Sequence, residues 1–92
     1  GIFDMELTYK GKPLVRNGKK IYYGNAYEKY ILVLTILATK EEDGAELPSR
    51  VVVQIQDTDP SLMFKPEQIV KQTEKTSLAE ALEIGVSWLE CM

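Results

Sequence analysis

The stretch YILVLTILA, residues 30–38, is the longest apolar run in this chain of 92 residues, and it decides the expected fold. Its even and odd positions form two apolar faces, and only Thr35 interrupts the odd one. A strand that is apolar on both sides must be covered on both sides, whereas a strand with one wet side alternates cleanly. The even face consists of Tyr30, Leu32, Leu34, Ile36 and Ala38, and the odd face of Ile31, Val33 and Leu37.

Short strands and tight turns are expected before this run. Residues 5–9 alternate between apolar and polar side chains, as a half-buried strand does, and Lys10-Gly11 supplies a turn into a second strand over 12–16. Pro13 cannot donate a hydrogen bond to a neighbouring strand. We therefore expect the second strand to lie at a sheet edge or to begin after this proline.

Asn17-Gly18 is the strongest local hairpin pattern in the chain. A two-residue type I′ turn needs positive φ at both central positions, and these two residue types tolerate it best. The pattern predicts a third strand over 19–23. It also predicts cross-strand pairs of Leu14 with Ile21 and of Val15 with Lys20, with Leu14, Ile21 and Tyr23 on one face and Val15 and Tyr22 on the other.

A second tight reversal is expected at Gly24-Asn25. If it is also two residues long, it places Tyr22 opposite Tyr27 as an aromatic cross-strand pair. The long apolar strand then runs from about residue 27 to residue 39.

The segment after the apolar strand is polar and acidic over 39–49, which predicts a solvated hairpin loop rather than a cation site. Residues 50–58 then alternate as a strand with one wet face, with Val52 as the exception. Asp57 and Asp59 could offer two carboxylates to a metal, but Asp-x-Asp-Pro after a strand is common turn chemistry. We therefore predict no metal site.

The C-terminal third begins with an ambiguous segment. Pro66 suits the first position of a short helix, while the alternation of residues 69–76 favours a final strand, which we prefer. Met63 and Phe64 are expected to fill the core in either case.

A C-terminal helix is predicted from Ser77, because Ser77 and Glu80 have the spacing of a capping box. Gly85 lies on its apolar side, where a glycine costs about 1 kcal/mol relative to alanine, so we expect close packing there. Trp88 is expected to anchor the core or an interface. The apolar stripe consists of Leu78, Ala81, Leu82, Gly85, Val86 and Leu89.

These patterns predict an α+β fold, in which an antiparallel β-meander of about five strands is followed by a C-terminal α-helix packed on one face. Residues 1–92 are expected to form a single globular domain. Met5 is a candidate natural start, in which case residues 1–4 are a cloning remnant.

Composition limits the chemistry that this chain can carry. It has no histidine and one cysteine, Cys91, and it contains none of the glycine-rich, nucleophile or metal-ligand motifs. We therefore predict that it is not an enzyme and binds no cofactor. No run approaches the ~18 apolar residues of a membrane span, and a single thiol near the end cannot form an internal disulfide. A cytoplasmic setting is expected.

Charge and aromatic residues favour a nucleic-acid alternative. Residues 1–30 carry a net charge of +3 and all five tyrosines, while the remaining 62 residues carry −6. Tyrosines that stack on bases, with lysines along the phosphates, are typical of surfaces that bind single strands. The acidic pI of about 4.9 opposes this reading. The candidate contacts are Arg16, Lys19, Lys20, Tyr22 and Tyr27.

The two-faced strand favours an interaction or assembly module. One helix can cover only one face of a small sheet, so a second copy of the chain, a different protein or curling of the sheet must cover the other. We expect a homodimer formed through the sheet. The candidate interface residues are Ile31, Val33, Leu37 and Val52.

Overall fold

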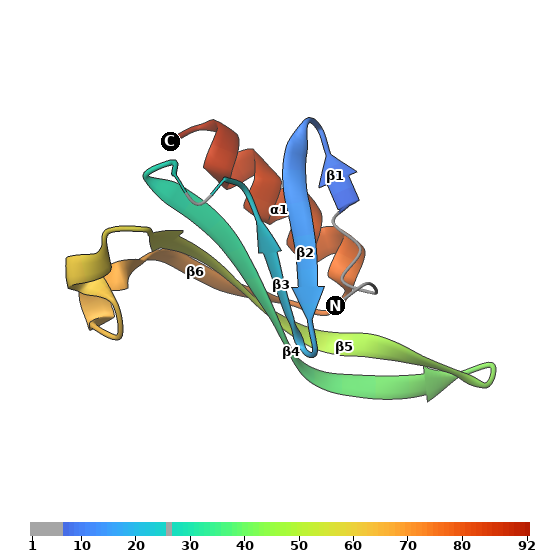
Figure 1. Cartoon of the computed structure of the whole chain (residues 1–92). Coiled ribbons are helices and arrows are strands. Elements are labelled where there is room, and N and C mark those ends of the chain that lie inside the picture. The colour runs from blue at the N-terminus through green and yellow to red at the C-terminus, as the bar shows by residue number, and fades with distance from the viewer. Residues whose placement is uncertain (1–6, 26) are drawn as a thin grey trace.

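The computed structural model describes residues 7–25 and 27–92. Its six strands form one antiparallel sheet in which each strand pairs with its neighbours in sequence (Figure 1). The strands are β1 (Leu7–Tyr9), β2 (Lys12–Asn17), β3 (Lys20–Tyr23), β4 (Tyr30–Glu42), β5 (Ala45–Asp57) and β6 (Ile69–Lys75). The helix α1 (Leu78–Glu90) follows β6. The expected α+β meander with a terminal helix is confirmed, and β6 supplies a sixth strand. Residues 1–4 and the first two residues of the strand expected over 5–9 lie outside the described residues.

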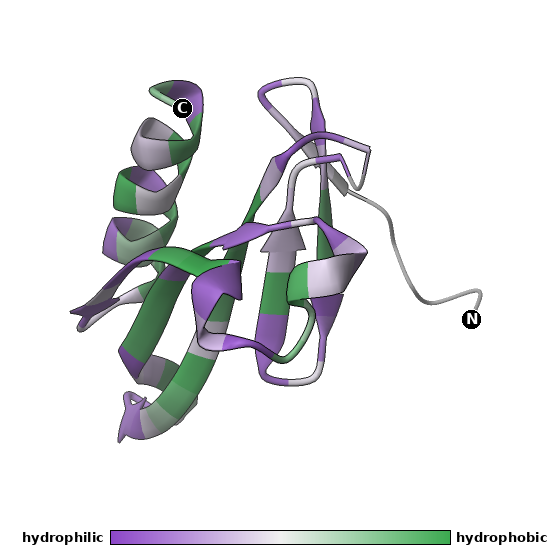
Figure 2. Ribbon diagram, turned by 90° about the vertical axis from the view of Figure 1, so that its left-hand side faces the viewer, coloured by the Kyte–Doolittle hydropathy of each residue, from purple (hydrophilic) through white to green (hydrophobic). Residues whose placement is uncertain are grey.

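The core lies between the sheet and α1, which stands on one side of the sheet in Figure 2. The even-numbered face of β4 points into this core, as expected from the apolar run. Alternate residues of β5 and the predicted stripe of α1 complete it. The buried residues that these elements contribute are Leu32, Leu34, Ile36, Val51, Val53, Ile55, Ala81, Val86 and Leu89.

The start and the close packing of α1 agree with the sequence. The Ser77 hydroxyl accepts a hydrogen bond from the Glu80 backbone N–H at 3.2 Å, which caps the helix. Gly85 packs directly on β4, since a Cβ at this position would lie 2.4 Å from Leu32 Cδ1. Trp88 is half-buried against the core.

The β2–β3 hairpin forms, but its predicted register is wrong by two residues. Asn17 pairs with Lys20, so the two-residue turn is Gly18-Lys19, with φ +62° at Gly18. A positive φ at the first turn position alone fits a type II′ turn rather than type I′. The Lys19 carbonyl also accepts a hydrogen bond from Ile36 N at 2.8 Å, which ties the turn to β4. A shift of two residues preserves the predicted faces, because the side-chain period of a strand is two.

The predicted tight turn at Gly24-Asn25 is also wrong. Residue 33 of β4, not Tyr27, lies opposite Tyr22, and β4 begins only at Tyr30. The Asn25 carbonyl accepts a hydrogen bond from Glu28 N at 3.0 Å, and its side-chain amide donates to Glu28 Oε1 at 2.9 Å. These local bonds hold a longer connection, in which Tyr27 is almost fully exposed.

Pro13 is accommodated inside the sheet rather than at its edge, contrary to expectation. Strand β2 lies between β1 and β3 and includes this proline. The Pro13 carbonyl accepts a hydrogen bond from Gly24 N at 3.1 Å. Because the nitrogen and the carbonyl of a residue in an antiparallel strand point the same way, the missing N–H faces Gly24 at the end of β3, so the proline costs the sheet one ladder bond at the end of the β2–β3 pairing.

The segment 39–49 is not the solvated loop that its polarity predicted. Strands β4 and β5 are each 13 residues long and continue to a two-residue turn at Asp43-Gly44. Both turn residues have positive φ, 51° and 78°, as a type I′ hairpin requires. Figure 1 shows the distal part of this hairpin, residues 37–50, projecting beyond the other strands. We call this part the arm.

The segment 60–68 forms two single 3₁₀ turns, Pro60–Leu62 and Pro66–Gln68, each beginning at a proline. The helical and strand interpretations of 65–75 therefore each hold in part, with a short turn first and β6 after it. Met63 and Phe64 do not fill the core as expected, since Phe64 is 94 % exposed. Helix α1 closes the core, and the two 3₁₀ turns contribute no buried residue to it.

Candidate interaction surface

The face of the sheet opposite α1, which we call the open face, contains a row of side chains that crosses five strands. By register, the row consists of Val15, Tyr22, Val33, Gln54 and Gln72. Val33 is only 1 % exposed although α1 lies on the other side of the sheet. Larger side chains on the neighbouring strands, Tyr22 and Gln54, flank it, and such cross-strand contacts can bury a valine without a second layer.

Hydrogen-bonded glutamines cover the part of the open face formed by β5 and β6. Gln54 Nε2 donates to Gln72 Oε1 at 2.7 Å, and Gln56 Nε2 donates to Gln54 Oε1 at 2.8 Å. Each amide satisfies a neighbour, so the glutamines make this part of the open face polar without adding charge. The paired Arg50 and Glu74 lie beside them on the same two strands.

A strip of exposed apolar surface runs from the open face onto the arm. Leu37 is 49 % exposed and Leu47 is 42 % exposed. The neighbour of Leu37, Ile36, belongs to the core, and the neighbour of Leu47, Pro48, lines a cavity with Leu78 of α1. Because successive side chains of a strand point to opposite faces, Leu47 belongs to the open face. Leu37 lies in the bulge between Ile36 and Ala38, next to Ala38, which pairs with Arg50 of the open face.

The four candidate interface residues all lie on the open face, but they differ in exposure. Val33 is buried within the single chain, Ile31 and Val52 are half-buried, and Leu37 is exposed. The sequence analysis missed Leu47, because it placed residues 39–49 in a loop. The Asp43-Gly44 pair, a favoured type I′ dipeptide, would have revealed the longer strands.

The five candidate nucleic-acid contacts do not form one surface. Arg16 and Lys19 line a cavity on the α1 side, beside Thr39 and Glu46 of the arm. By register Lys20 and Tyr22 belong to the open face, while Tyr27 lies in the loop beyond the other end of β3. The structure therefore separates the tyrosines from most of the cations that the sequence brings together.

Folding also interleaves the basic and acidic segments of the chain. Lys10 Nζ lies 3.8 Å from Glu90 Oε1, and Lys29 Nζ lies 3.4 Å from Asp57 Oδ2. Both ion pairs join the basic N-terminal third to the acidic remainder. The charge asymmetry of the sequence is thus reduced in space, which weakens long-range attraction of an anionic polymer.

Two carboxyl groups have lowered pKa values with clear causes. Hydrogen bonds from the Asn25 amide and from Lys12 lower the pKa of Glu28. The backbone N–H and hydroxyl of Ser61 lower the pKa of Asp59. A general acid at neutral pH needs a raised carboxyl pKa, so these two groups fit structural roles better than catalytic ones.

The turn 57–61 satisfies its carboxylates internally. Asp57 Oδ1 accepts from Asp59 N at 2.9 Å, and Asp59 Oδ1 accepts from Ser61 N at 2.9 Å. This is the turn chemistry that the sequence favoured over a metal site. Within residues 7–25 and 27–92, no group of three or more His, Cys, Asp or Glu side chains could hold a metal ion.

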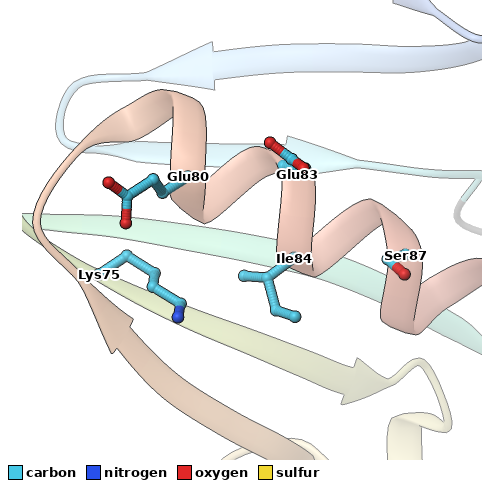
Figure 3. A pocket seen from close by; sticks show the side chains of 5 residues that line it. All are labelled: Lys75, Glu80, Glu83, Ile84 and Ser87. Atoms are coloured by element: carbon cyan, nitrogen blue, oxygen red, sulfur yellow. The ribbon is translucent and has the colours of Figure 1, made fainter.

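A shallow hollow between the end of β6 and α1 is the cavity drawn in Figure 3. Its volume is about 290 Å³, and the Lys75 side chain runs along it toward Ile84. Ligand pockets are mostly apolar with a few placed polar groups. Four of the five side chains that line this hollow are polar or charged and it is open to solvent, so a substrate site is not supported there. Its lining consists of Lys75, Glu80, Glu83, Ile84 and Ser87.

Comparison of the chain with protein-family models, with curated proteins and with solved structures gives no match. In the part of the chain that the structure describes, no helix is long and apolar enough to cross a membrane.

Proposed function

We propose that this protein is a small, non-catalytic interaction module that self-associates through the open face of its sheet. The observation that carries the proposal is the half-exposed pair Leu37 and Leu47 beside half-buried Val52, on the face that α1 leaves uncovered. Burial of apolar area on association contributes roughly 25 cal/mol per Å², which makes such a strip the natural centre of an interface.

The charge of the open face supports a second copy as the partner. Its central row contains only uncharged side chains, and the Arg50 guanidinium Nε lies 2.6 Å from Glu74 Oε1, so this cation is neutralised within the chain. In a two-fold contact each patch meets itself. A face with no unpaired charges at its centre can pack against the same face of a second copy without repulsion.

The same charges argue against the nucleic-acid alternative. Binding to phosphates requires several unpaired cations on one surface. Among the described residues of the open face, Lys20 lies on the same strand as Tyr22 and Arg50 is paired with Glu74, while Tyr27 lies elsewhere. A cytoplasmic setting remains a prediction of the sequence analysis.

The test replaces both exposed leucines, Leu37→Lys and Leu47→Lys, in one variant. If the open face holds two copies together, the weight-average mass from light scattering should fall by half relative to the unchanged protein. Val33 is unsuitable for this test, because a lysine at a buried position would unfold the chain.

The matched control is Met63→Lys with Phe64→Lys, which adds the same charge and removes exposed apolar surface from the connection between β5 and β6, outside the strands. This control should keep the mass of the unchanged protein. An unaltered mass for the leucine variant, or a monomeric unchanged protein at about 100 μM, would overturn the proposal.

A further inference from the structure

Within residues 7–25 and 27–92 the sheet has one long edge, and no described strand pairs with its outer backbone. The edge strands are β1, with three residues, and β6, with seven. In the described residues β6 pairs only with β5, so the outward N–H and C=O groups of its other side face solvent. Such an edge is a template for another strand unless side chains guard it.

The charged side chains of β6 do not guard this edge. Lysines often protect exposed edges, but Lys71 Nζ lies 5.3 Å from the centre of the Trp88 ring, over the protein's own helix. Glu74 is bound to Arg50 of β5, and Gln72 accepts from Gln54 of β5. Lys75, the remaining charged side chain of β6, lines the hollow beside α1. These side chains contact their own sheet and helix rather than the outer edge of β6.

We propose that β6 pairs antiparallel with β6 of a second copy, centred on Gln72. In this register Val70 lies opposite Glu74 of the second copy, Lys71 opposite Thr73, and Ile69 opposite Lys75. No like charges face each other. The register of β6 with β5 shifts at Val70, whereas Lys71–Lys75 pair regularly, so the central residues 71–73 lie in the regular part of the strand in both copies.

The charge pattern selects this register over its neighbours. If the pairing is centred on residue 71 instead, Lys71 lies opposite Lys71 of the second copy. If it is centred on residue 73, Lys71 lies opposite Lys75. Like charges directly opposite each other destabilise a strand pair. A register change of one residue would turn one of the two sheets over, so that the two helices would lie on opposite sides of the joined sheet.

This contact is distinct from the one proposed for the open face. Its two-fold axis stands perpendicular to the sheet, whereas face-to-face packing has its axis in the plane of the sheet. Two perpendicular two-fold axes generate a closed tetramer when they intersect, which is a common symmetry of soluble oligomers. The two contacts can therefore coexist, and each can be tested without the other.

The experiment uses the Leu37→Lys, Leu47→Lys protein as background, so that only the edge contact remains, and measures its dimer dissociation constant by sedimentation equilibrium. In the dimer, Val70→Glu creates two contacts between like charges, each with Glu74 of the other copy. This variant should raise the dissociation constant about fivefold. Val70→Lys gains two opposite-charge pairs and should lower it by a similar factor. Val70 is 42 % exposed, so both variants should fold.

A second position checks the centre of the register. At Gln72 the two copies meet on the axis, so Gln72→Lys and Gln72→Glu should both weaken the dimer, unlike the opposed pair at Val70. A monomeric background protein, or the same response to both charges at Val70, would overturn the edge pairing and leave the open-face proposal untouched. Conversely, an edge dimer that responds as described stands even if the leucine substitutions leave the mass of the protein unchanged.

Discussion

Gly85 shows how one residue sets the distance between helix and sheet. A Cβ there would lie 2.4 Å from Leu32 Cδ1 and 2.7 Å from Leu32 Cδ2, and the Leu32 side chain is fully buried. Because Leu32 has no free space to move into, α1 can approach β4 this closely only with a glycine. The helix gives up about 1 kcal/mol of propensity for that approach.

We predict that Gly85→Ala lowers the free energy of unfolding by about 1 kcal/mol, measured by urea denaturation. Overpacking costs about 1–3 kcal/mol, and the gain in helix propensity offsets only about 1 kcal/mol of it. Ser87→Ala, at an exposed position of the same helix, is the control and should stabilise slightly. If Gly85→Ala stabilises as much as Ser87→Ala, the contact with Leu32 does not limit the approach.

A double variant tests the partner directly. Leu32→Val removes part of the side chain that a Cβ at Gly85 would meet, at the expense of a small cavity. The variant Gly85→Ala, Leu32→Val should therefore be more stable than the sum of the two single effects predicts, as expected for residues in contact.

At the scale of the elements, the arm differs from the rest of the β4–β5 hairpin. Strand β3 pairs with β4 over residues 32–35, and β6 pairs with β5 over residues 51–56. Beyond those pairs the arm is a two-stranded ribbon, with irregular pairing around Ala38. An isolated two-stranded ribbon is marginally stable in water.

Backbone amides in residues 40–47 should therefore exchange with solvent deuterium faster than those in residues 32–36 and 51–55. Local opening without flanking strands costs less free energy than opening of the central sheet. Hydrogen exchange followed by NMR at neutral pH measures this difference. Equal protection in the two regions would mean that another contact stabilises the arm. If that contact is a second copy on the open face, the protection of the arm should fall when the protein is diluted.

At the scale of the whole molecule, charge contacts connect segments that lie far apart in sequence. Lys12 Nζ donates to Glu28 Oε2 at 3.3 Å, and Lys29 pairs with Asp57. Exposed pairs of this kind each contribute little at neutral pH. Their effect on stability becomes visible when the carboxyl groups are titrated.

Stability should fall on acidification, because Glu28 and Asp59 have lowered pKa values in the folded chain. A group with a lowered folded pKa contributes stability above its unfolded pKa, and the contribution is lost as the pH falls through the folded pKa. The urea midpoint should decrease from about pH 5 to about pH 3. Glu28→Gln should show a smaller decrease over this window, while an identical pH profile would contradict the assigned role of Glu28.

The sequence by itself determined the α+β class, the order of strands and helix, the cap at Ser77 and the stripe of α1, since these depend on local periodicity and capping chemistry. It also indicated the close approach at Gly85. Residue patterns of this kind report which face of an element is apolar.

Only the tertiary structure decided the register of the β2–β3 hairpin and the exposure of Val33 and Phe64. The Gly18-Lys19 turn is bonded to β4 by Lys19, a contact between distant segments that no local pattern contains. Likewise, Val33 is buried by side chains from strands on either side of it. Burial depends on which strands lie side by side, because shielding by a neighbour is a property of the assembled sheet and not of the strand alone.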